Sequence, residues 1–198
     1  MLLYGTVTSP FVRRVRVVAE ELGLPVTMVD SSTVEGQERL RKITPIWKIP
    51  VAEIDGQVIF DSNQIIEYLF EEHGHGPLRA MRPATRVEER NLIAAVDGAL
   101  EAAIRLFYVR RDGQDPAQIP YLAKERDRIT EVMGWLDRRV ESGYCTSDRR
   151  FGLGELVLYS SLSWMRFRDV YPIDRHSNLV AFEAEHQRRP SLASSAPR

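Results

Sequence analysis

The chain has little of what paired-thiol or membrane proteins need. Its 198 residues include a single cysteine, Cys145, which excludes an internal disulfide and any redox centre built from two cysteines of the same chain. No apolar run reaches the roughly 18 residues that a transmembrane helix needs, and the N-terminus has no hydrophobic signal core. The sequence therefore predicts a cytoplasmic protein without a membrane role.

An excess of charge of one sign and clustered metal ligands are also lacking. Lys and Arg number 27 against 28 Asp and Glu, and no broad basic cluster gives the footprint of a nucleic-acid-binding surface. We interpret the basic run Arg13, Arg14 and Arg16 as the solvated face of a helix. The histidines lie without metal-ligand spacing, at His73, His75, His176 and His186. We therefore expect no nucleic-acid partner and no metal site.

What is present is enough apolar sequence for one large domain or two small ones, since 43% of the residues are hydrophobic. The first 80 residues alternate between strand and helix patterns. Apolar runs at 2–5 and 25–30 flank a helical pattern, which predicts a strand–helix–strand unit with parallel strands. A short helix is expected within 32–45. Asp55-Gly56 then predicts a tight hairpin, and a further helix is expected over 61–74.

The pattern changes near residue 85, after which the strand signal disappears. Long amphipathic helices are predicted at 86–111 and 118–143, with two more at 153–170 and 176–189. We divide the chain into an α/β domain, a linker containing Gly and Pro, and an all-helical domain, at residues 1–76, 77–84 and 85–198. A polar tail is expected over 191–198.

Ser9 is the first residue that raises a question of chemistry. Pro10 suits the first position of a helix, and the apolar residues that follow recur at helical spacing until Gly23 ends the pattern. Ser9 then stands where its oxygen would cap the exposed backbone N–H groups. The same hydroxyl could instead be presented to an anion bound at the positive end of the helix. The pattern alone leaves both roles open.

Three separated segments, "SPFVRR" from Ser9, "WKIPV" from Trp47 and "DSNQIIEYL" from Asp61, occur in an order and spacing that resemble bacterial glutathione S-transferases of the cytosolic type. The resemblance spans nearly the whole chain. It implies a thioredoxin-like α/β N-terminal domain and an all-α C-terminal helical bundle. It also implies that Ser9 is the catalytic residue, which donates its O–H to the thiolate of glutathione.

The resemblance assigns the other glutathione-binding residues by segment. Pro50 is expected to be cis, with the backbone of Ile49 meeting the cysteinyl part of glutathione and Lys48 its glycyl end. Asp61 and Ser62 would hold the γ-glutamyl group. Each has a plainer interpretation: a trans turn proline, a surface lysine and helix caps. Tyr4, which has catalytic counterparts in other classes, is expected to be a packed strand residue.

The co-substrate and the assembly are less defined by the sequence. By segment position the co-substrate pocket would include Phe11, Arg105, Tyr108 and Trp164, although each also fits a core or surface role. The implied function is a detoxifying transferase in which the activated glutathione thiolate attacks a small electrophile, and the implied assembly is a homodimer. The alternatives are a non-catalytic glutathione-binding or protein-interaction module, and a glutathione-dependent disulfide reductase or peroxidase.

Two departures from the family pattern bear on local geometry. Trp47 stands where the family usually has glycine before the lysine of the loop, so the backbone there is less predictable. Gly152 stands where a Ser or Thr usually opens a core helix of the second domain. Glycine caps a helix without a side-chain acceptor, at a cost of a few tenths of a kcal/mol.

Overall fold

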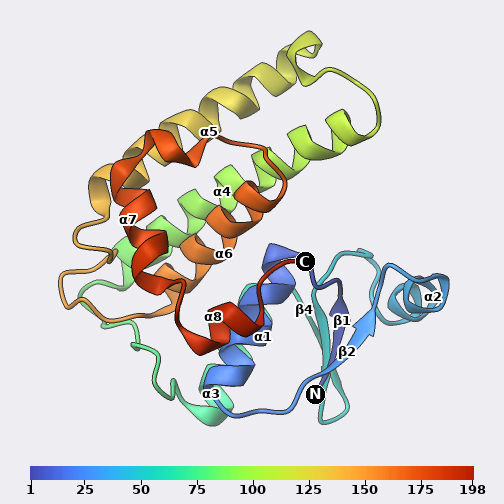
Figure 1. Cartoon of the computed structure of the whole chain (residues 1–198). Helices are drawn as coiled ribbons and strands as arrows, with labels where there is room; N and C mark the ends of the chain where they lie inside the picture. The colour runs from blue at the N-terminus through green and yellow to red at the C-terminus, as the bar shows by residue number, and fades with distance from the viewer. The chain divides into compact units, whose positions relative to one another are not determined.

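The computed structural model describes residues 1–198 and divides into two compact units (Figure 1). Unit 1 comprises Met1–Leu78 together with Arg189–Arg198, and unit 2 comprises Arg79–Arg188. Unit 1 is α/β and unit 2 is helical. Residues 189–198 follow the helical pattern in the sequence, but their contacts place them with unit 1. None of the helices is both long and apolar enough to cross a membrane.

Unit 1 is built on a four-stranded sheet with the order β2-β1-β3-β4. Its strands are β1 (Leu2–Gly5), β2 (Thr27–Asp30), β3 (Val51–Ile54) and β4 (Gln57–Phe60). β1 pairs parallel with β2 and antiparallel with β3, and β3 pairs antiparallel with β4. The predicted strand–helix–strand unit and the predicted hairpin at Asp55-Gly56 are both confirmed.

Three helices of unit 1 also lie where the sequence predicts them: α1 (Pro10–Glu21), α2 (Val34–Ile43) and α3 (Ser62–His73). α1 buries Val12, Val15 and Val18 completely, as the helical spacing of apolar residues requires. α2 begins beside the end of β2, where Gly36 lies against the carbonyl oxygen of Asp30 so closely that a Cβ would overlap it.

The expectation that the basic run of α1 faces solvent is wrong. Arg13 is 2% exposed and Arg14 is completely buried. Arg13 donates from Nη2 to the carbonyl oxygen of Leu192 at 2.8 Å and from Nε to Ser195 Oγ at 3.2 Å. Buried guanidinium groups need such acceptors, because an unpaired buried charge is costly. The guanidinium of Arg14 lies 4.9 Å from the ring centroid of Phe11.

The segment expected to be a polar tail instead contains a short helix, α8 (Pro190–Ser194), which packs against α1 (Figure 1). Leu192 is 1% exposed, and Ser191 and Ser195 are also buried. The hydroxyl of Ser194 donates to a carboxylate oxygen of Glu20 at 2.7 Å. A sequence of small polar residues forms a helix here because α1 supplies both the apolar contact and the hydrogen-bond partners.

Unit 2 consists of four α-helices: α4 (Arg86–Arg111), α5 (Pro120–Arg139), α6 (Leu153–Phe167) and α7 (Ser177–His186). Two 3₁₀ turns, η1 (Pro116–Gln118) and η2 (Ile173–Arg175), complete it. α4 and α5 form an extended helical hairpin (Figure 1). All four helices were expected, with ends that differ by a few residues.

The start of α6 is held by a buried ionic cluster. The guanidinium of Arg79 donates to both carboxylate oxygens of Glu89 at 2.8 Å and lies 3.4 Å from Glu155 Oε2. Glu155 Oε2 also accepts the backbone N–H of Gly152 at 2.9 Å. The glycine cap therefore lacks a side-chain acceptor, as expected, but its own N–H is satisfied by the glutamate three residues on.

Candidate functional site

The strand register brings the three segments that begin at Ser9, Trp47 and Asp61 to one edge of the sheet. Tyr4 near the end of β1 pairs with Val51 at the start of β3, and Val51 pairs with Phe60 at the end of β4. The chain therefore leaves β1, enters β3 and leaves β4 at the same edge. Because neighbouring strands lie about 4.8 Å apart, the segments that carry Ser9, Pro50 and Asp61 are neighbours there.

Ser9 is the N-cap of α1, as the sequence predicted. Its Oγ accepts the backbone N–H of Val12 at 3.3 Å, and Pro10 occupies the first helical position. Capping uses a lone pair of the serine oxygen and leaves the hydroxyl hydrogen uncommitted, since Ser9 Oγ has no acceptor of its own in the chain. The capping role and the donor role are therefore compatible in this geometry.

The loop before β3 has two unusual backbone features. The Ile49–Pro50 peptide bond is cis, as expected from the resemblance. Trp47 has a φ of 52°, in the left-handed region that favours glycine, which explains why a glycine suits this position. The Trp47 side chain is 59% exposed, and the guanidinium of Arg41 lies 5.1 Å from its ring centroid. Lys48 beside it is exposed.

Asp61 and Ser62 open α3 in different ways. Asp61 is the N-cap, and its Oδ1 accepts the backbone N–H of Asn63 at 2.8 Å with a φ of 79° at Asp61 itself. Ser62 is only 2% exposed, yet its hydroxyl has no hydrogen-bond partner within the chain. The plain capping role thus holds for Asp61 but does not account for the Ser62 hydroxyl.

Two helix N-termini face this edge. α1 begins just after β1 and α3 just after β4, and the two helices pack against each other. Each N-terminus carries backbone N–H groups without helical acceptors and a partial positive charge. Such an arrangement suits the binding of anionic groups, a thiolate at one helix and a carboxylate at the other.

Tyr4 is excluded from the site by its contacts. It is 2% exposed, and its hydroxyl donates to a carboxylate oxygen of Glu53 and accepts from Arg39 Nη2 at 3.1 Å. Burial raises the pKa of this phenol, and the neighbouring carboxylate raises it further. The expectation that Tyr4 is a packed strand residue is confirmed.

The four candidates for a co-substrate pocket have different surroundings. Phe11 stacks on Arg14, and Trp164 is 5% exposed in the core of unit 2, where its ring centroid lies 5.7 Å from that of Phe107. Arg105 donates from Nε and Nη2 to Glu125 Oε2, at 3.0 and 2.5 Å. Tyr108 is 47% exposed. The contacts of Trp164 and Arg105 are those of structural residues, and a co-substrate role stays a prediction.

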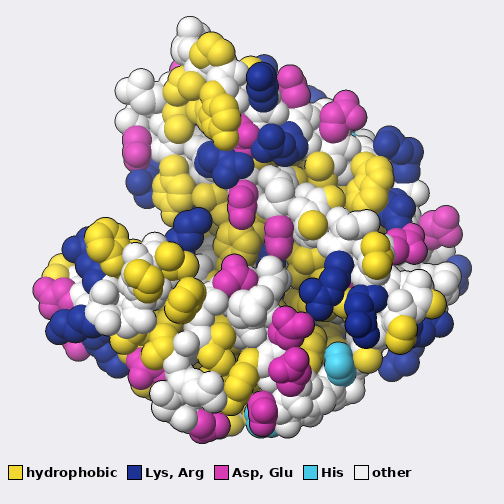
Figure 2. Space-filling model, turned by 180° about the vertical axis from the view of Figure 1, so that it is seen from behind, with side chains coloured by type: hydrophobic (Ala, Val, Ile, Leu, Met, Phe, Trp, Pro, Cys, Tyr) yellow, Lys and Arg dark blue, Asp and Glu magenta, His cyan; other side chains and the backbone are white.

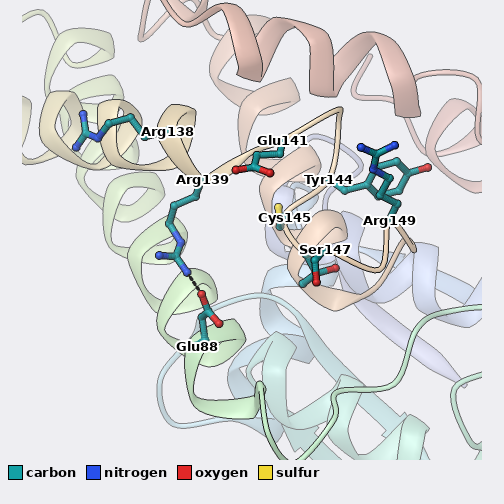
Figure 3. A pocket seen from close by; sticks show the side chains of 9 residues that line it. Glu88, Arg138, Arg139, Glu141, Tyr144, Cys145, Ser147 and Arg149 are labelled. Atoms are coloured by element: carbon teal, nitrogen blue, oxygen red, sulfur yellow. Dashed lines mark hydrogen bonds and ion pairs between the residues drawn. The ribbon is translucent and has the colours of Figure 1, made fainter.

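Unit 2 also contains a pocket that sequence reasoning missed, of about 400 Å³, beside the loop between α5 and α6 (Figure 3). Arg139 and Glu88 form an ion pair in its wall, and Cys145 also lines it. Burial raises the pKa of the Cys145 thiol well above its usual value, and the carboxylates of Glu155 and Glu89 add to this. Cys145 is therefore a thiol, not a thiolate, at neutral pH, and is a poor nucleophile.

No group of three or more His, Cys, Asp or Glu side chains is arranged to hold a metal ion. His75 instead stacks on Phe70, with 4.3 Å between ring centroids. His186 is buried, and its Nε2 lies 2.7 Å from the carbonyl oxygen of Gly143. Both histidines thus have structural surroundings.

Comparisons with known proteins agree with this architecture. Residues 3–77 match the family described as "Glutathione S-transferase, N-terminal domain". An Escherichia coli protein described as an uncharacterized GST-like protein, YibF, is 26% identical over 203 residues, covering 100% of this chain and 98% of its own.

Two solved structures cover nearly the whole chain. A glutathione S-transferase from Methylobacterium radiotolerans in complex with glutathione sulfonate is 27% identical with a TM-score of 0.84, over 99% of this chain and 94% of that one. One from Methylobacillus flagellatus with glutathione bound is 26% identical with a TM-score of 0.85, over 100% of this chain and 99% of that one. The chain thus has the glutathione S-transferase fold, and residues 3–77 match the N-terminal domain of that family.

Proposed function

We propose that the chain is a glutathione S-transferase of the serine type, in which Ser9 stabilises the thiolate of bound glutathione for attack on a small electrophile. The observation that carries the proposal is the uncommitted hydroxyl hydrogen of Ser9 at the N-terminus of α1. That N-terminus shares a sheet edge with the cis-proline loop and the start of α3. The two solved relatives that bind glutathione or its sulfonate support the choice of ligand.

The chemistry follows from the acidity of a thiol. A free cysteine thiol has a pKa near 8.5, so at neutral pH glutathione is mostly protonated and a weak nucleophile. An O–H donor aimed at sulfur favours the thiolate, and the positive end of α1 acts in the same direction. Each unit by which the pKa falls corresponds to about 1.4 kcal/mol of thiolate stabilisation. The Ser9 oxygen keeps its proton, and glutathione itself attacks the electrophile.

The rest of glutathione would be held by the neighbouring segments. The backbone of Ile49, fixed by the cis bond to Pro50, would pair with the cysteinyl part of the tripeptide. Ser62, whose hydroxyl has no partner in the chain, and Asp61 would hold the γ-glutamyl group at the start of α3. Lys48 would meet the glycyl carboxylate.

Calorimetry with glutathione tests the binding part of the proposal. We expect the native chain to bind glutathione detectably and the Asp61→Ala, Ser62→Ala double variant to bind it at least tenfold more weakly. That loss of affinity corresponds to about 1.4 kcal/mol of binding free energy. A Glu71→Gln variant, which removes an exposed carboxylate from the same helix, serves as the control and should bind normally. Equal affinity in the native chain and the double variant would remove the assigned γ-glutamyl site.

Activity assays separate the transferase from its alternatives. A chloronitroarene, an organic peroxide and a mixed disulfide report transferase, peroxidase and disulfide reductase activity in turn. Conjugation of the chloronitroarene supports the proposal. Binding of glutathione without turnover of any of the three would favour the non-catalytic module, and turnover of the mixed disulfide alone would favour the reductase.

We further propose a homodimer in which the first domain of one subunit meets the second domain of the other. Val58 and Phe60 on the edge strand β4 are each 40% exposed, which leaves apolar side chains uncovered in the single chain. Sedimentation at micromolar concentration tests this directly, and a monomer there would contradict it.

A further inference from the structure

The tip of the α4–α5 hairpin holds a small cavity that the proposed function does not use. Its volume is about 220 Å³, and it lies among the end of α4, the 3₁₀ turn η1, the start of α5 and the segment after α6. The apolar part of its lining is made by Leu106, Phe107, Ala117, Leu122, Ala123 and Val170. A cavity with such a lining favours an apolar ligand body.

The aromatic part of this lining is held in place. The ring centroid of Phe107 lies 5.7 Å from that of Trp164, and the guanidinium of Arg168 lies 5.0 Å from the Phe107 ring. Because Trp164 is buried, it fixes Phe107 from the core side. The cavity therefore presents a pre-positioned aromatic ring.

Three charged side chains line the same cavity. Arg110 Nη2 donates to the carbonyl oxygens of Arg168 at 3.0 Å and Asp169 at 3.2 Å, which fixes its guanidinium. Asp115 accepts the backbone N–H of Ala117 at 2.9 Å and caps η1. Arg126 forms no ion pair. Two cations and one anion leave a net positive charge, with Arg126 available to a ligand.

The spacing along both helices explains why apolar and basic groups meet here. Leu106 and Arg110 are four residues apart on α4, and Leu122 and Arg126 are four residues apart on α5, so each pair shares a helix face. Arg105, the co-substrate candidate, is turned by about 100° from Leu106 and pairs with Glu125. The cavity thus uses a different face of α4.

Figure 2 shows hydrophobic side chains gathered around the end of the α4–α5 hairpin, beside charged side chains of both signs. The pocket of Figure 3 differs in its lining, which is mostly charged or polar: three arginines, two glutamates, Thr146 and Ser147. The cavity at the hairpin tip has the larger apolar lining and is therefore the better candidate for an anionic ligand with an apolar body.

We propose that this cavity binds a small aromatic monocarboxylate, with the ring against Phe107 and the carboxylate at Arg126. Its size fits, since an apolar cavity of about 150 Å³ accommodates benzene and the additional volume accommodates a carboxymethyl group. The guanidinium provides a charge-assisted hydrogen bond to the carboxylate. The site does not require glutathione, so the test of this proposal is independent of the test of the proposed transferase activity.

Calorimetry of the full chain without glutathione tests the proposal with phenylacetate and its uncharged counterpart phenylacetamide. We expect phenylacetate to bind with a millimolar dissociation constant, as befits about ten heavy atoms, and phenylacetamide to bind about fivefold more weakly. Arg126→Gln should lower phenylacetate affinity about fivefold and abolish the preference for the anion. Lys124→Gln removes a neighbouring exposed cation on α5 outside the cavity and should leave both ligands unaffected.

A second variant tests the location of the ligand without changing charge. Ala123→Phe fills the cavity and should abolish binding of both ligands, while circular dichroism and the unfolding midpoint report that the chain is folded. Absence of phenylacetate binding at roughly 10 mM would overturn the proposal. Equal phenylacetate affinity in the native chain and in folded Ala123→Phe would do so too, as would an Arg126→Gln variant that keeps its preference for the anion.

Discussion

Glu21 at the end of α1 accepts two parallel hydrogen bonds from Arg189, 168 residues later, with Nε–Oε1 at 2.7 Å and Nη2–Oε2 at 2.8 Å. The hydroxyl of Ser191 donates to the same carboxylate. The Glu21 side chain is 10% exposed and that of Arg189 is 25% exposed, so the pair is shielded from solvent. The carboxylate thereby anchors the start of α8 to the first helix of the chain.

Removing this carboxylate should destabilise unit 1. Glu21→Gln keeps the side-chain size but loses the charge, and we expect the free energy of unfolding to fall by about 1–2 kcal/mol. Urea denaturation measures the loss. Glu71→Gln on α3 is the matched control, because Glu71 is exposed and has no such partner, and should change stability by less than about 0.5 kcal/mol. Equal effects of the two substitutions would contradict the anchoring role.

The same pair predicts a dependence of stability on pH. Burial raises the pKa of Glu21, but the hydrogen bonds from Arg189 and Ser191 outweigh it, so its pKa in the folded chain lies below its usual value. The contribution of the Glu21 carboxylate to the free energy of unfolding is therefore complete above its unfolded-state pKa of about 4.3. It is lost as the pH falls through the folded-state pKa. The stability difference between the native chain and Glu21→Gln should shrink below about pH 4.

Ser9→Ala separates capping from thiolate stabilisation. Loss of the cap alone should cost about 0.5–2 kcal/mol of stability and leave the activity of the folded protein nearly unchanged. Loss of a donor to the thiolate should also lower kcat/KM by about ten- to a hundredfold, less than for an oxyanion because sulfur is a weaker acceptor. The pKa of bound glutathione, read from thiolate absorbance, should rise by about one unit.

Two variants control for that measurement. Ser9→Thr retains a hydroxyl that can cap and donate, so it should keep most of the activity. Tyr4→Phe removes a hydroxyl that is already bound by Glu53 and Arg39, so it should leave the thiol titration unchanged. A folded Ser9→Ala protein with native turnover and an unshifted thiol titration would leave Ser9 with the capping role alone.

Two glycines in helices should respond to alanine in opposite directions. At Gly36 a Cβ would overlap the carbonyl oxygen of Asp30, which is backbone and cannot move aside, so Gly36→Ala should destabilise by about 1–3 kcal/mol. At Gly98, inside α4, a Cβ meets no atom within 4 Å. Gly98→Ala should therefore stabilise by about 0.5–1 kcal/mol through helix propensity. Thermal or urea unfolding of both variants gives the comparison, and the same sign for both would refute it.

The single cysteine should resist thiol reagents in the folded chain. Burial keeps the pKa of Cys145 well above its usual value, and its backbone N–H donates to Glu155 Oε1 at 3.1 Å. We expect a disulfide reagent at pH 7 to react at least tenfold more slowly with the native chain than with the urea-unfolded chain. Cys145 is only partly buried, so the slower reaction is expected from the raised pKa of its thiol. Similar rates in the two states would show that the folded chain does not keep this thiol protonated.

Much of the fold is encoded locally, which is why the sequence predicts it. Asp55-Gly56 adopts the turn conformation that glycine favours, and Ser9-Pro10 begins α1 with a cap and a pre-set φ. The helices of unit 2 follow from their apolar spacing. The strand register then determines which loops lie at the same edge of the sheet, because Tyr4 pairs with Val51 and Val51 pairs with Phe60.

What the sequence did not predict depends on partners far along the chain. The burial of Arg13 requires the carbonyl oxygen of Leu192, and α8 requires the surface of α1, so neither can be inferred from a local window. The cis bond at Pro50 was expected only from the family resemblance, since local preference favours trans. The cavities of unit 2 likewise arise where helices and loops meet, with no signature in any one segment.

The membership of residues 189–198 in unit 1 has a consequence for biosynthesis. The ribosome makes residues 1–78 first, but the acceptors for Arg13 and the partner of Glu21 emerge only after the whole of unit 2 has been translated. Unit 1 is therefore begun first and completed last, and a nascent chain that ends before Arg189 lacks the ion-pair partner of Glu21 and two of the acceptors of Arg13. During synthesis the helical unit has the opportunity to fold before the α/β unit is finished.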